Sequence, residues 1–166
     1  HLYNAMNPYT HRAPGPVGAA ADKACAEVEL ICDGVHIHPA AVRTTFKIFG
    51  DGRIILISDS MRATGLEDGD YTLGGQAVKV TGNLATLHDG TIAGSVTNLL
   101  DCMRTAVLKM GIPLESAVKC AAVNPAKCVG IYDKHGSISA GKKADVVLLK
   151  KDGLALQQVI LGGKLL

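Results

Sequence analysis

Three residues that can bind a metal or transfer a proton lie where apolar segments end. His36 follows the apolar run at 28–32, Asp59 follows the run "IILIS", and His1 would end a strand if one precedes it. In α/β enzymes the site is built from polar residues at the carboxyl ends of parallel strands. A carboxylate at the end of a buried strand must be paired, bound to a metal or used in catalysis, so Asp59 is the hardest of the three to explain as structural. A structural role stays open for both histidines.

Two further segments could contact a ligand. The small residues of "TIAGS" (91–95) leave backbone groups accessible, which suits a loop that lines a ligand. An ordinary helix entry with Ser95 as the N-cap explains the same residues. Arg12 in "HRAPG" could recognise an anion or could be a solvated loop charge. The local sequence leaves both alternatives open in each case.

The pattern around these residues predicts the parallel sheet that would bring them together. "VELICDGVH" starts as an apolar run and ends in polar groups, and "RIILISDS" is a second apolar run without polar alternation. Between them, Pro39 in the first turn and Gly50 as a stop predict a helix. Continuous apolar strands joined by a helix are typical of a parallel sheet covered by helices. Residues 16–26 predict a further helix in front of this unit.

The rest of the chain changes character twice. "YTLGGQAVKVTGNLATLHDG" alternates apolar and polar residues between glycine turns, which predicts one or two hairpins. Helical periodicity returns at 96–110 and again from Pro113, where Leu114, Ala117, Val118 and Ala121 are expected to face the core. "NPAKCVGI" begins a short further helix, and residues 137–166 predict three β segments of a small separate unit. Two clear parallel strands cannot close a barrel, so we expect the C-terminal portion of a protein about twice as long.

The composition excludes several classes of protein. Of 166 residues, 48% are hydrophobic, which is enough for a core, and the net charge is only +2. Such a small, evenly spread charge argues against nucleic-acid or membrane partners. No apolar run approaches the roughly 18 residues of a membrane span and no charged-then-apolar leader is present, so we expect a cytoplasmic protein. The five cysteines are odd in number and lack CxxC spacing, which predicts buried, reduced thiols.

Taken together, eight stretches resemble the N-acetylglucosamine-6-phosphate deacetylases of the amidohydrolase superfamily. In the family's order they are "HLYNAM", "HRAPGPVGAA", "DGVHIHPAAVR", "ISDSMRATG", "YTLGG", "DGTIAGS", "NPAKCVGI" and "GSISAGKKADVVLL". The last of these alone would be weak, since many amidohydrolases carry it. The resemblance implies a (β/α)8 barrel with a small β-sandwich made from both chain ends. It starts at the sixth barrel strand, so residues 1–136 would be barrel strands six to eight, with a hairpin insertion at about 70–90, and residues 137–166 would be sandwich strands.

The resemblance also implies a reaction and a role for each matching residue. The family hydrolyses the acetamide of N-acetylglucosamine 6-phosphate to glucosamine 6-phosphate and acetate. A divalent metal, usually zinc and otherwise iron, manganese or cobalt, polarises the carbonyl and activates water. His1 matches a metal ligand, and Asp59 matches the acid/base that moves a proton from that water to the leaving amine. The positions that match substrate contacts are Asn4, Ala5, Arg12, Asp33, Gly34, Val35, His36, Ile92, Ala93 and Gly94.

Within that set, His36 and Arg12 resemble the pair that recognises the phosphate, and in the family's dimer a phosphate ligand can come from the neighbouring subunit. The family's other metal ligands, a Glu and a second His, lie upstream of position 1. The resemblance therefore implies that this piece alone is inactive. It implies three partners: the N-terminal half of the same protein, a second copy in a homodimer, and a small phosphorylated amino sugar as substrate.

Two other interpretations were weighed against this one. A non-catalytic scaffold remnant of a barrel enzyme would be expected to have lost His1, Arg12 or Asp59, and all three are present. A different amidohydrolase, such as a dihydropyrimidinase or an adenine deaminase, is disfavoured by "YTLGG", by "DGTIAGS" and by the spacing of "HLYNAM" and "HR".

Overall fold

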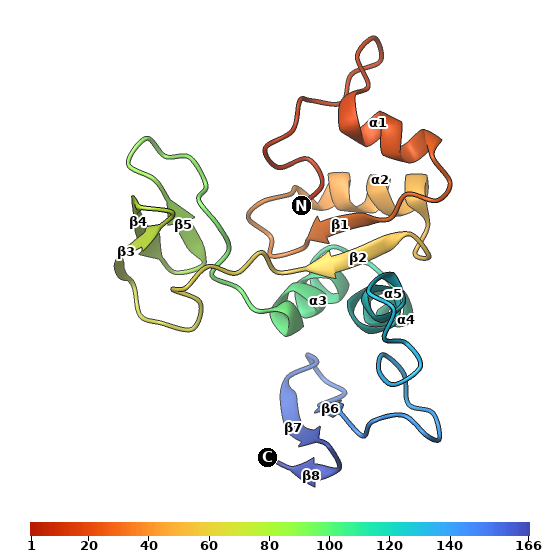
Figure 1. The fold of residues 1–166 in the computed structure, drawn as a ribbon. Coiled ribbons are helices and arrows are strands. Elements are labelled where there is room, and N and C mark those ends of the chain that lie inside the picture. The colour runs from red at the N-terminus through yellow and green to blue at the C-terminus, as the bar shows by residue number, and fades with distance from the viewer.

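The structure, a computed structural model, describes all residues 1–166 and contains three separate β-sheets. Its helices are α1 (Gly15–Asp22), α2 (Pro39–Phe49), α3 (Leu99–Leu108), α4 (Leu114–Val118) and α5 (Asn124–Cys128), with a π-helical turn at Lys119–Val123. Its strands are β1 (Val28–Ile31), β2 (Ile54–Ile57), β3 (Gly69–Leu73), β4 (Gln76–Thr81), β5 (Leu84–Thr86), β6 (Val146–Leu149), β7 (Leu156–Leu161) and β8 (Lys164–Leu165). In Figure 1 the pair β1–β2 lies between α1 and α2 on one side and α3 to α5 on the other.

The central pair β1–β2 is parallel, as the two apolar runs predict. Its register pairs Val28 with Ile54 and Ile31 with Ile57. Leu30, Ile54 and Leu56 are essentially inaccessible to solvent and belong to the main core, which also takes residues from α2, α3 and α4. Fully burying a side chain of this size stabilises the fold by roughly 1.5–3 kcal/mol. Burial on both faces explains why β2 carries no polar residue, whereas β1 has one exposed polar residue, Glu29.

The crossover between the two strands is the predicted helix, α2, with both of its ends capped. Pro39 occupies the first turn, and the His38 ring accepts a 3.2 Å hydrogen bond from the backbone N–H of Ala40. At the other end Gly50 has φ +65° and its N–H donates to the carbonyl of Phe46. The left-handed conformation at this stop favours glycine, which has no Cβ to clash.

The segment after β2 folds into a small antiparallel sheet of its own, in the order β3–β4–β5. This confirms the hairpins expected from the glycine turns. The sheet covers a separate apolar cluster made of Met61, Ala63, Val78, Val80 and Ala85. Figure 1 shows this unit beyond the carboxyl ends of β1 and β2, joined to them by two neighbouring segments.

The helices lie at the predicted positions, but their bounds and caps differ in detail. The helix expected at 96–110 is Leu99–Leu108, and the helix expected at 16–26 ends at Asp22. Ser95 is not an N-cap, because Asn98 caps α3 and accepts a 2.9 Å hydrogen bond from the N–H of Asp101. The inner face expected for the helix from Pro113 is wrong at two of its four positions, since Ala117 is buried and Ala121 packs against the main core but Leu114 and Val118 do not.

In α4 only Ala117 is buried, whereas Leu114 and Val118 are 41% and 44% exposed. The next buried residues along the chain are Cys120 and Asn124. Ala117, Cys120 and Asn124 are spaced by three and four residues, so the buried face is centred on them and leaves Leu114 and Val118 at its margin. The three β segments expected in the tail are present as the antiparallel sheet β6–β7–β8.

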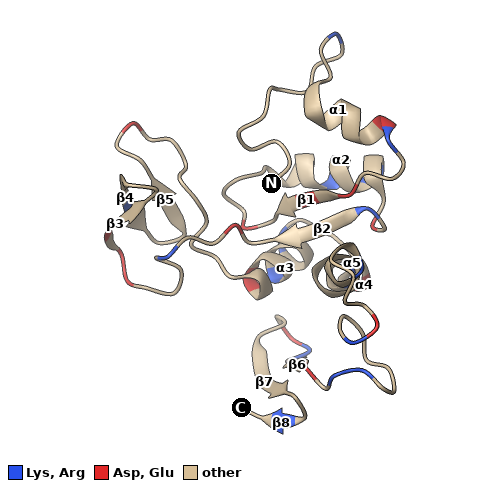
Figure 2. Cartoon of the chain, in the orientation of Figure 1, with Lys and Arg blue, Asp and Glu red and all other residues tan.

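Figure 2 shows basic and acidic residues interspersed along the elements. All five cysteines are free; Cys32, Cys102 and Cys120 are buried, as predicted, whereas Cys25 and Cys128 are exposed. None of the helices combines the length and the apolar character needed to cross a membrane.

Candidate active site

The carboxyl ends of β1 and β2 lie at one edge of the central sheet. Ile31 of β1 pairs with Ile57 of β2, the last pair in the register. Asp33 lies two residues after Ile31 and Asp59 lies two residues after Ile57, so the two carboxylates follow their strands at matching positions. The N–H of Leu2 donates a 2.8 Å hydrogen bond to the carbonyl of Glu29, so the start of the chain lies against β1 on the side away from β2. The order across the sheet is therefore residue 2, β1, β2. This order fits three successive strand ends, each carrying one of the predicted residues.

The first of these strand ends, "HLYNAM", has an unusual backbone. Tyr3 has φ +75° and Ala5 has φ +51°, values that cost roughly 1–3 kcal/mol for residues other than glycine. The Tyr3 hydroxyl is 2.6 Å from Oγ1 of Thr45, a fully buried residue on α2. This contact anchors the loop to α2. The His1 side chain is exposed, and its α-amino group lies 3.3 Å from Oε2 of Glu29.

Asp59, at the end of β2, is exposed and has φ +51°. Its carboxylate makes no hydrogen bond or ion pair within the chain. Its backbone carbonyl, in contrast, accepts a 3.0 Å hydrogen bond from the N–H of Ser95, and the N–H of Met61 donates to the carbonyl of Ser95 at 2.8 Å. A Cβ added to Gly94 would lie 3.7 Å from the Asp59 carbonyl. The loop 92–94 therefore lies directly beside Asp59.

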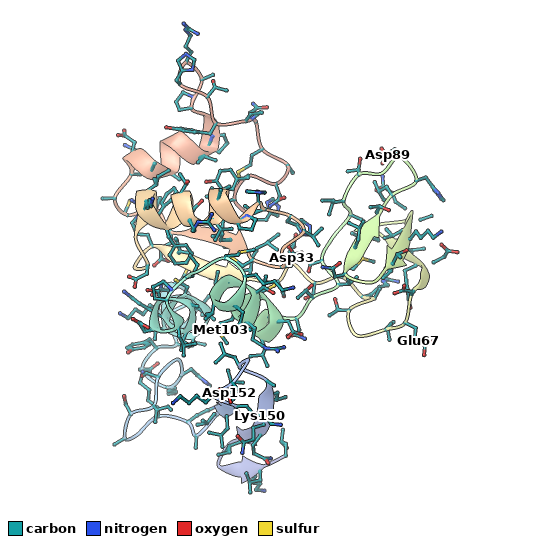
Figure 3. All side chains as sticks on the ribbon, turned by 180° about the vertical axis from the view of Figure 1, so that it is seen from behind. Asp33, Glu67, Asp89, Met103, Lys150 and Asp152 are labelled. Atoms are coloured by element: carbon teal, nitrogen blue, oxygen red, sulfur yellow. The ribbon has the colours of Figure 1, made fainter.

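Asp33 and His36 form an enclosed pair in the loop after β1. The Asp33 side chain has no exposed area and that of His36 is 7% exposed. Oδ1 of Asp33 accepts hydrogen bonds from the backbone N–H groups of Val35 (2.9 Å) and His36 (3.0 Å), and Oδ2 lies 2.6 Å from Nδ1 of His36. Burial raises the pKa of Asp33, but the hydrogen bond from the His36 ring and the two backbone N–H groups outweigh it and lower that pKa below its usual value. Figure 3 shows Asp33 at the edge of the central sheet that faces the β3–β5 unit.

Arg12 is not brought to the other predicted residues. It is exposed in a turn closed by a hydrogen bond from the N–H of Thr10 to the carbonyl of Ala13, and its guanidinium makes no contact within the chain. The loop that carries it projects away from the central strands in Figure 1. Within this chain, therefore, Arg12 and His36 do not form a pair.

One open pocket of about 320 Å³ lies between α3, the β4–β5 turn and the loop after β1. It is lined by Asp33, Asn83, Thr97, Asp101, Arg104, Thr105, Leu108 and Lys109. Asp33 is the only predicted site residue that lines this pocket. His1, Arg12 and Asp59 lie outside the pocket. The candidate site is thus an open edge of the sheet rather than a closed cavity.

The residues of this chain do not suffice for a catalytic metal. Nowhere do three His, Cys, Asp or Glu side chains come together in a way that could hold an ion. Catalytic zinc sites use three protein ligands and leave one position open. The chain therefore does not provide a complete metal site on its own.

Two residues that position the site were missed by the sequence analysis. Thr45 anchors Tyr3, and Ser95 connects the loop 92–94 to Asp59. A polar Thr between the apolar positions of an amphipathic helix was a usable signal for the first. The second depends on a backbone contact between residues 36 positions apart, for which the sequence carries no local signal.

Comparison with known proteins shows extensive similarity. The model of the family described as "Amidohydrolase family" matches residues 9–166. The N-acetylglucosamine-6-phosphate deacetylase of Bacillus subtilis (strain 168) is 43% identical over 152 residues, which are 92% of this chain and 38% of that protein. A putative N-acetylgalactosamine-6-phosphate deacetylase of Escherichia coli (strain K12) is 39% identical over 165 residues, which are 99% of this chain and 98% of that protein.

Among solved structures, a mutant N-acetyl-D-glucosamine-6-phosphate deacetylase from Mycobacterium smegmatis, in complex with N-acetyl-D-glucosamine-6-phosphate, matches with a TM-score of 0.92. It is 39% identical, and the match covers 99% of this chain and 44% of that one. The chain thus spans less than half the length of the Bacillus and Mycobacterium proteins.

Proposed function

This chain belongs to the amidohydrolase family, and we propose that the natural protein containing it hydrolyses the acetamide of N-acetylglucosamine 6-phosphate to glucosamine 6-phosphate and acetate. The observation that carries this proposal is the fold match, over nearly the whole chain, to a deacetylase that holds this sugar phosphate. The exposed, unpaired carboxylate of Asp59 at a strand end gives the reaction a proton-transfer group.

In the proposed site Asp59 is the acid/base. It takes a proton from the attacking water as the C–O bond forms and gives it to the nitrogen as the C–N bond breaks. Because the carboxylate has no partner within the chain, it is free to transfer the proton. The hydrogen bond from the Ser95 N–H to the Asp59 carbonyl fixes the backbone position of Asp59. The loop of Ile92, Ala93 and Gly94 lies beside it and lines the sugar.

Two regions would recognise the rest of the substrate. Asn4 and Ala5 contact the sugar from the neighbouring strand end, held there by the anchored Tyr3. The segment from Asp33 through Gly34 and Val35 to His36 contributes a phosphate contact through the His36 ring. Arg12 contributes a second phosphate contact from the neighbouring subunit of a homodimer, which is consistent with its distance from His36 within one chain.

By the family resemblance, His1 would be one of three protein ligands of a divalent metal, zinc. The other two would come from outside these 166 residues, since the chain itself gathers no third ligand. When bound, such a metal supplies Lewis-acid polarisation of the acetyl carbonyl. By the same proposal, β1 and β2 are barrel strands seven and eight, residues 1–136 are barrel and residues 137–166 complete a β-sandwich.

A second substrate deserves a direct comparison, because the Escherichia coli relative is named for the galactosamine sugar. N-Acetylgalactosamine 6-phosphate differs from the glucosamine compound only at the configuration of C4. The acetamide and the phosphate are the same in both, so the same catalytic group and the same phosphate contacts would serve either.

The experiment is acetate release by the purified natural protein from each 6-phosphate and from each unphosphorylated sugar. We expect the two phosphorylated sugars to be hydrolysed, the glucosamine compound with the higher kcat/KM. Asp59→Asn should reduce kcat by at least about a thousandfold with KM within threefold, because it removes proton transfer and leaves the ground-state contacts. Turnover of Asp59→Asn within tenfold of wild type would refute the role of Asp59. No acetate from any of the four sugars would refute the function.

A further inference from the structure

The carboxylate of Asp33 has no free oxygen with which to contact a substrate. Oδ1 already accepts two backbone N–H donors, Oδ2 accepts the ring Nδ1 of His36, and the side chain has no exposed area. Each oxygen of a carboxylate has about two acceptor positions, and here both oxygens are used within one loop. Asp33 must therefore act through the His36 ring, to which it is hydrogen-bonded.

The group it holds is a ring with one free nitrogen. Nε2 of His36 makes no hydrogen bond, and no unpartnered side-chain nitrogen or oxygen in the structure is fully buried. Nε2 is thus the part of an otherwise enclosed ring that reaches solvent. A ring that is 7% exposed, held by a 2.6 Å contact, cannot turn freely.

We propose that Asp33 is a positioning residue that fixes the His36 ring by its Nδ1–H and presents Nε2, as a charged donor, to the phosphate of the substrate. This inference rests on the proposed function. With the carboxylate on one side and the phosphate on the other, the ring holds a proton on each nitrogen and lies between two anions. A charge-assisted hydrogen bond to phosphate is roughly twice as strong as a neutral one.

The geometry also determines what an isosteric substitution would do. In Asp33→Asn the amide oxygen has to take the place of Oδ1, because two backbone N–H groups point there. The amide NH₂ then faces Nδ1, which can only accept. A neutral ring must consequently move its proton to Nε2, so the substitution reverses the tautomer and removes the negative partner of the ring.

The test combines ring NMR with kinetics on the natural protein. In ¹⁵N-histidine-labelled protein at a pH where the ring is neutral, His36 should carry its proton on Nδ1 in the wild type and on Nε2 in Asp33→Asn, with the signal assigned by its loss in His36→Gln. In the wild-type complex with glucosamine 6-phosphate both nitrogens should be protonated.

Asp33→Asn should raise KM for N-acetylglucosamine 6-phosphate about tenfold, change kcat less than threefold, and leave KM for N-acetylglucosamine within twofold.

Asp101→Asn is the matched control, since Asp101 lines the same pocket but does not touch His36. It should leave the tautomer and both KM values unchanged. Adding Asp33→Asn to His36→Gln should have no further effect on KM, because the first residue acts through the second. A wild-type ring with its proton on Nε2 would overturn the inference even if Asp33→Asn does not fold, as would equal KM changes for the two sugars. If the wild type releases no acetate, the proposed function fails, while the tautomer comparison still decides whether Asp33 fixes the ring.

Discussion

The backbone N–H of Ser95 donates a 3.0 Å hydrogen bond to the carbonyl of Asp59, across 36 positions of the sequence. Ser60 and Ser95 also form an isolated parallel bridge, and the Ser60 hydroxyl donates to the carbonyl of Thr97 at 2.8 Å. The two segments that enter and leave the β3–β5 unit are thereby held together at their base. The position of Asp59 is set by this base and not by contacts of its own carboxylate.

Asp59, the residue proposed as the acid/base, should destabilise the fold. Asp59 has φ +51°, a conformation that glycine adopts without a Cβ clash, and its carboxylate has no partner to lose. We expect Asp59→Gly to raise the free energy of unfolding by about 1 kcal/mol while abolishing acetate release. Asp59→Ala should abolish activity equally without the gain in stability. Urea denaturation of the three proteins measures this, and a Gly variant no more stable than the Ala variant would contradict it.

The role proposed for Arg12 can be separated from that of an ordinary surface charge. In the natural protein Arg12→Ala should raise KM at least tenfold for N-acetylglucosamine 6-phosphate and less than threefold for N-acetylglucosamine, because the guanidinium pairs with an anion. Lys23→Ala removes an exposed positive charge from the end of α1 and should change neither KM. Equal effects of Arg12→Ala on the two sugars would leave Arg12 as a solvated loop charge.

The lowered pKa of Asp33 implies a pH dependence of stability. Its folded-state pKa lies below the unfolded value of about 4, so its contribution is fully present above pH 4 and is lost as the pH falls through the folded pKa. Asp33→Asn should therefore be less stable than wild type at pH 7, by about 2 kcal/mol, and the difference should shrink as the pH is lowered toward 3. Thermal melts at both pH values measure the difference. A gap that is constant or that widens in acid would show that the ionised carboxylate is not what stabilises this loop.

The elements nearest the site were predictable because each one follows local rules. β2 is apolar on both faces and β1 is apolar except for Glu29. α2 starts with a proline and ends at a left-handed glycine, and the β3–β5 unit has a glycine turn between each pair of strands. The Asp33–His36 contact spans only three residues and could have been anticipated, since an Asp side chain commonly accepts backbone N–H groups two or three residues later.

What was not predictable depends on non-local contacts. The helical segment from Leu114 buries Ala117, Cys120 and Asn124 and leaves Leu114 and Val118 exposed, because Cys120 and Asn124 bond to the carbonyls of Asp51 and Ile54. The exposure of Cys25 and Cys128 follows from where α1 and α5 end. Arg12 resembles a phosphate-contacting residue, yet its exposed loop projects away from the central strands, which its local sequence does not indicate.

The thiols should divide into two classes by reactivity. Burial raises the pKa of Cys102 and of Cys120 to about 12, and it also raises that of Cys32, so these three have almost no reactive thiolate at neutral pH. Brief treatment of the native protein with N-ethylmaleimide, followed by peptide mapping, should label the exposed Cys25 and Cys128 and spare the other three. Cys128 should react more slowly than Cys25, because its hydrogen bond with Glu27 raises its pKa. All five should be labelled in urea. Labelling of any buried thiol in the native protein at the rate of Cys25 would contradict the packing of the main core.

Asn124 should stabilise the fold without affecting catalysis. Its side chain is buried, and Nδ2 donates 2.7 Å hydrogen bonds to the carbonyls of Asp51 and Ile54, at the opposite end of β2 from Asp59. Asn124→Ala would leave the Ile54 carbonyl without a partner and the Asp51 carbonyl with only the weak Cys120 thiol donor at 3.4 Å. It should therefore lower the free energy of unfolding by about 2 kcal/mol, with kcat and KM of the folded protein unchanged. Asn98→Ala, which removes the exposed N-cap of α3, should cost only about 1 kcal/mol. An Asn124→Ala variant that loses no more free energy of unfolding than Asn98→Ala would contradict this role of Asn124 at the start of β2. A variant that keeps full stability but has a lower kcat would contradict it as well.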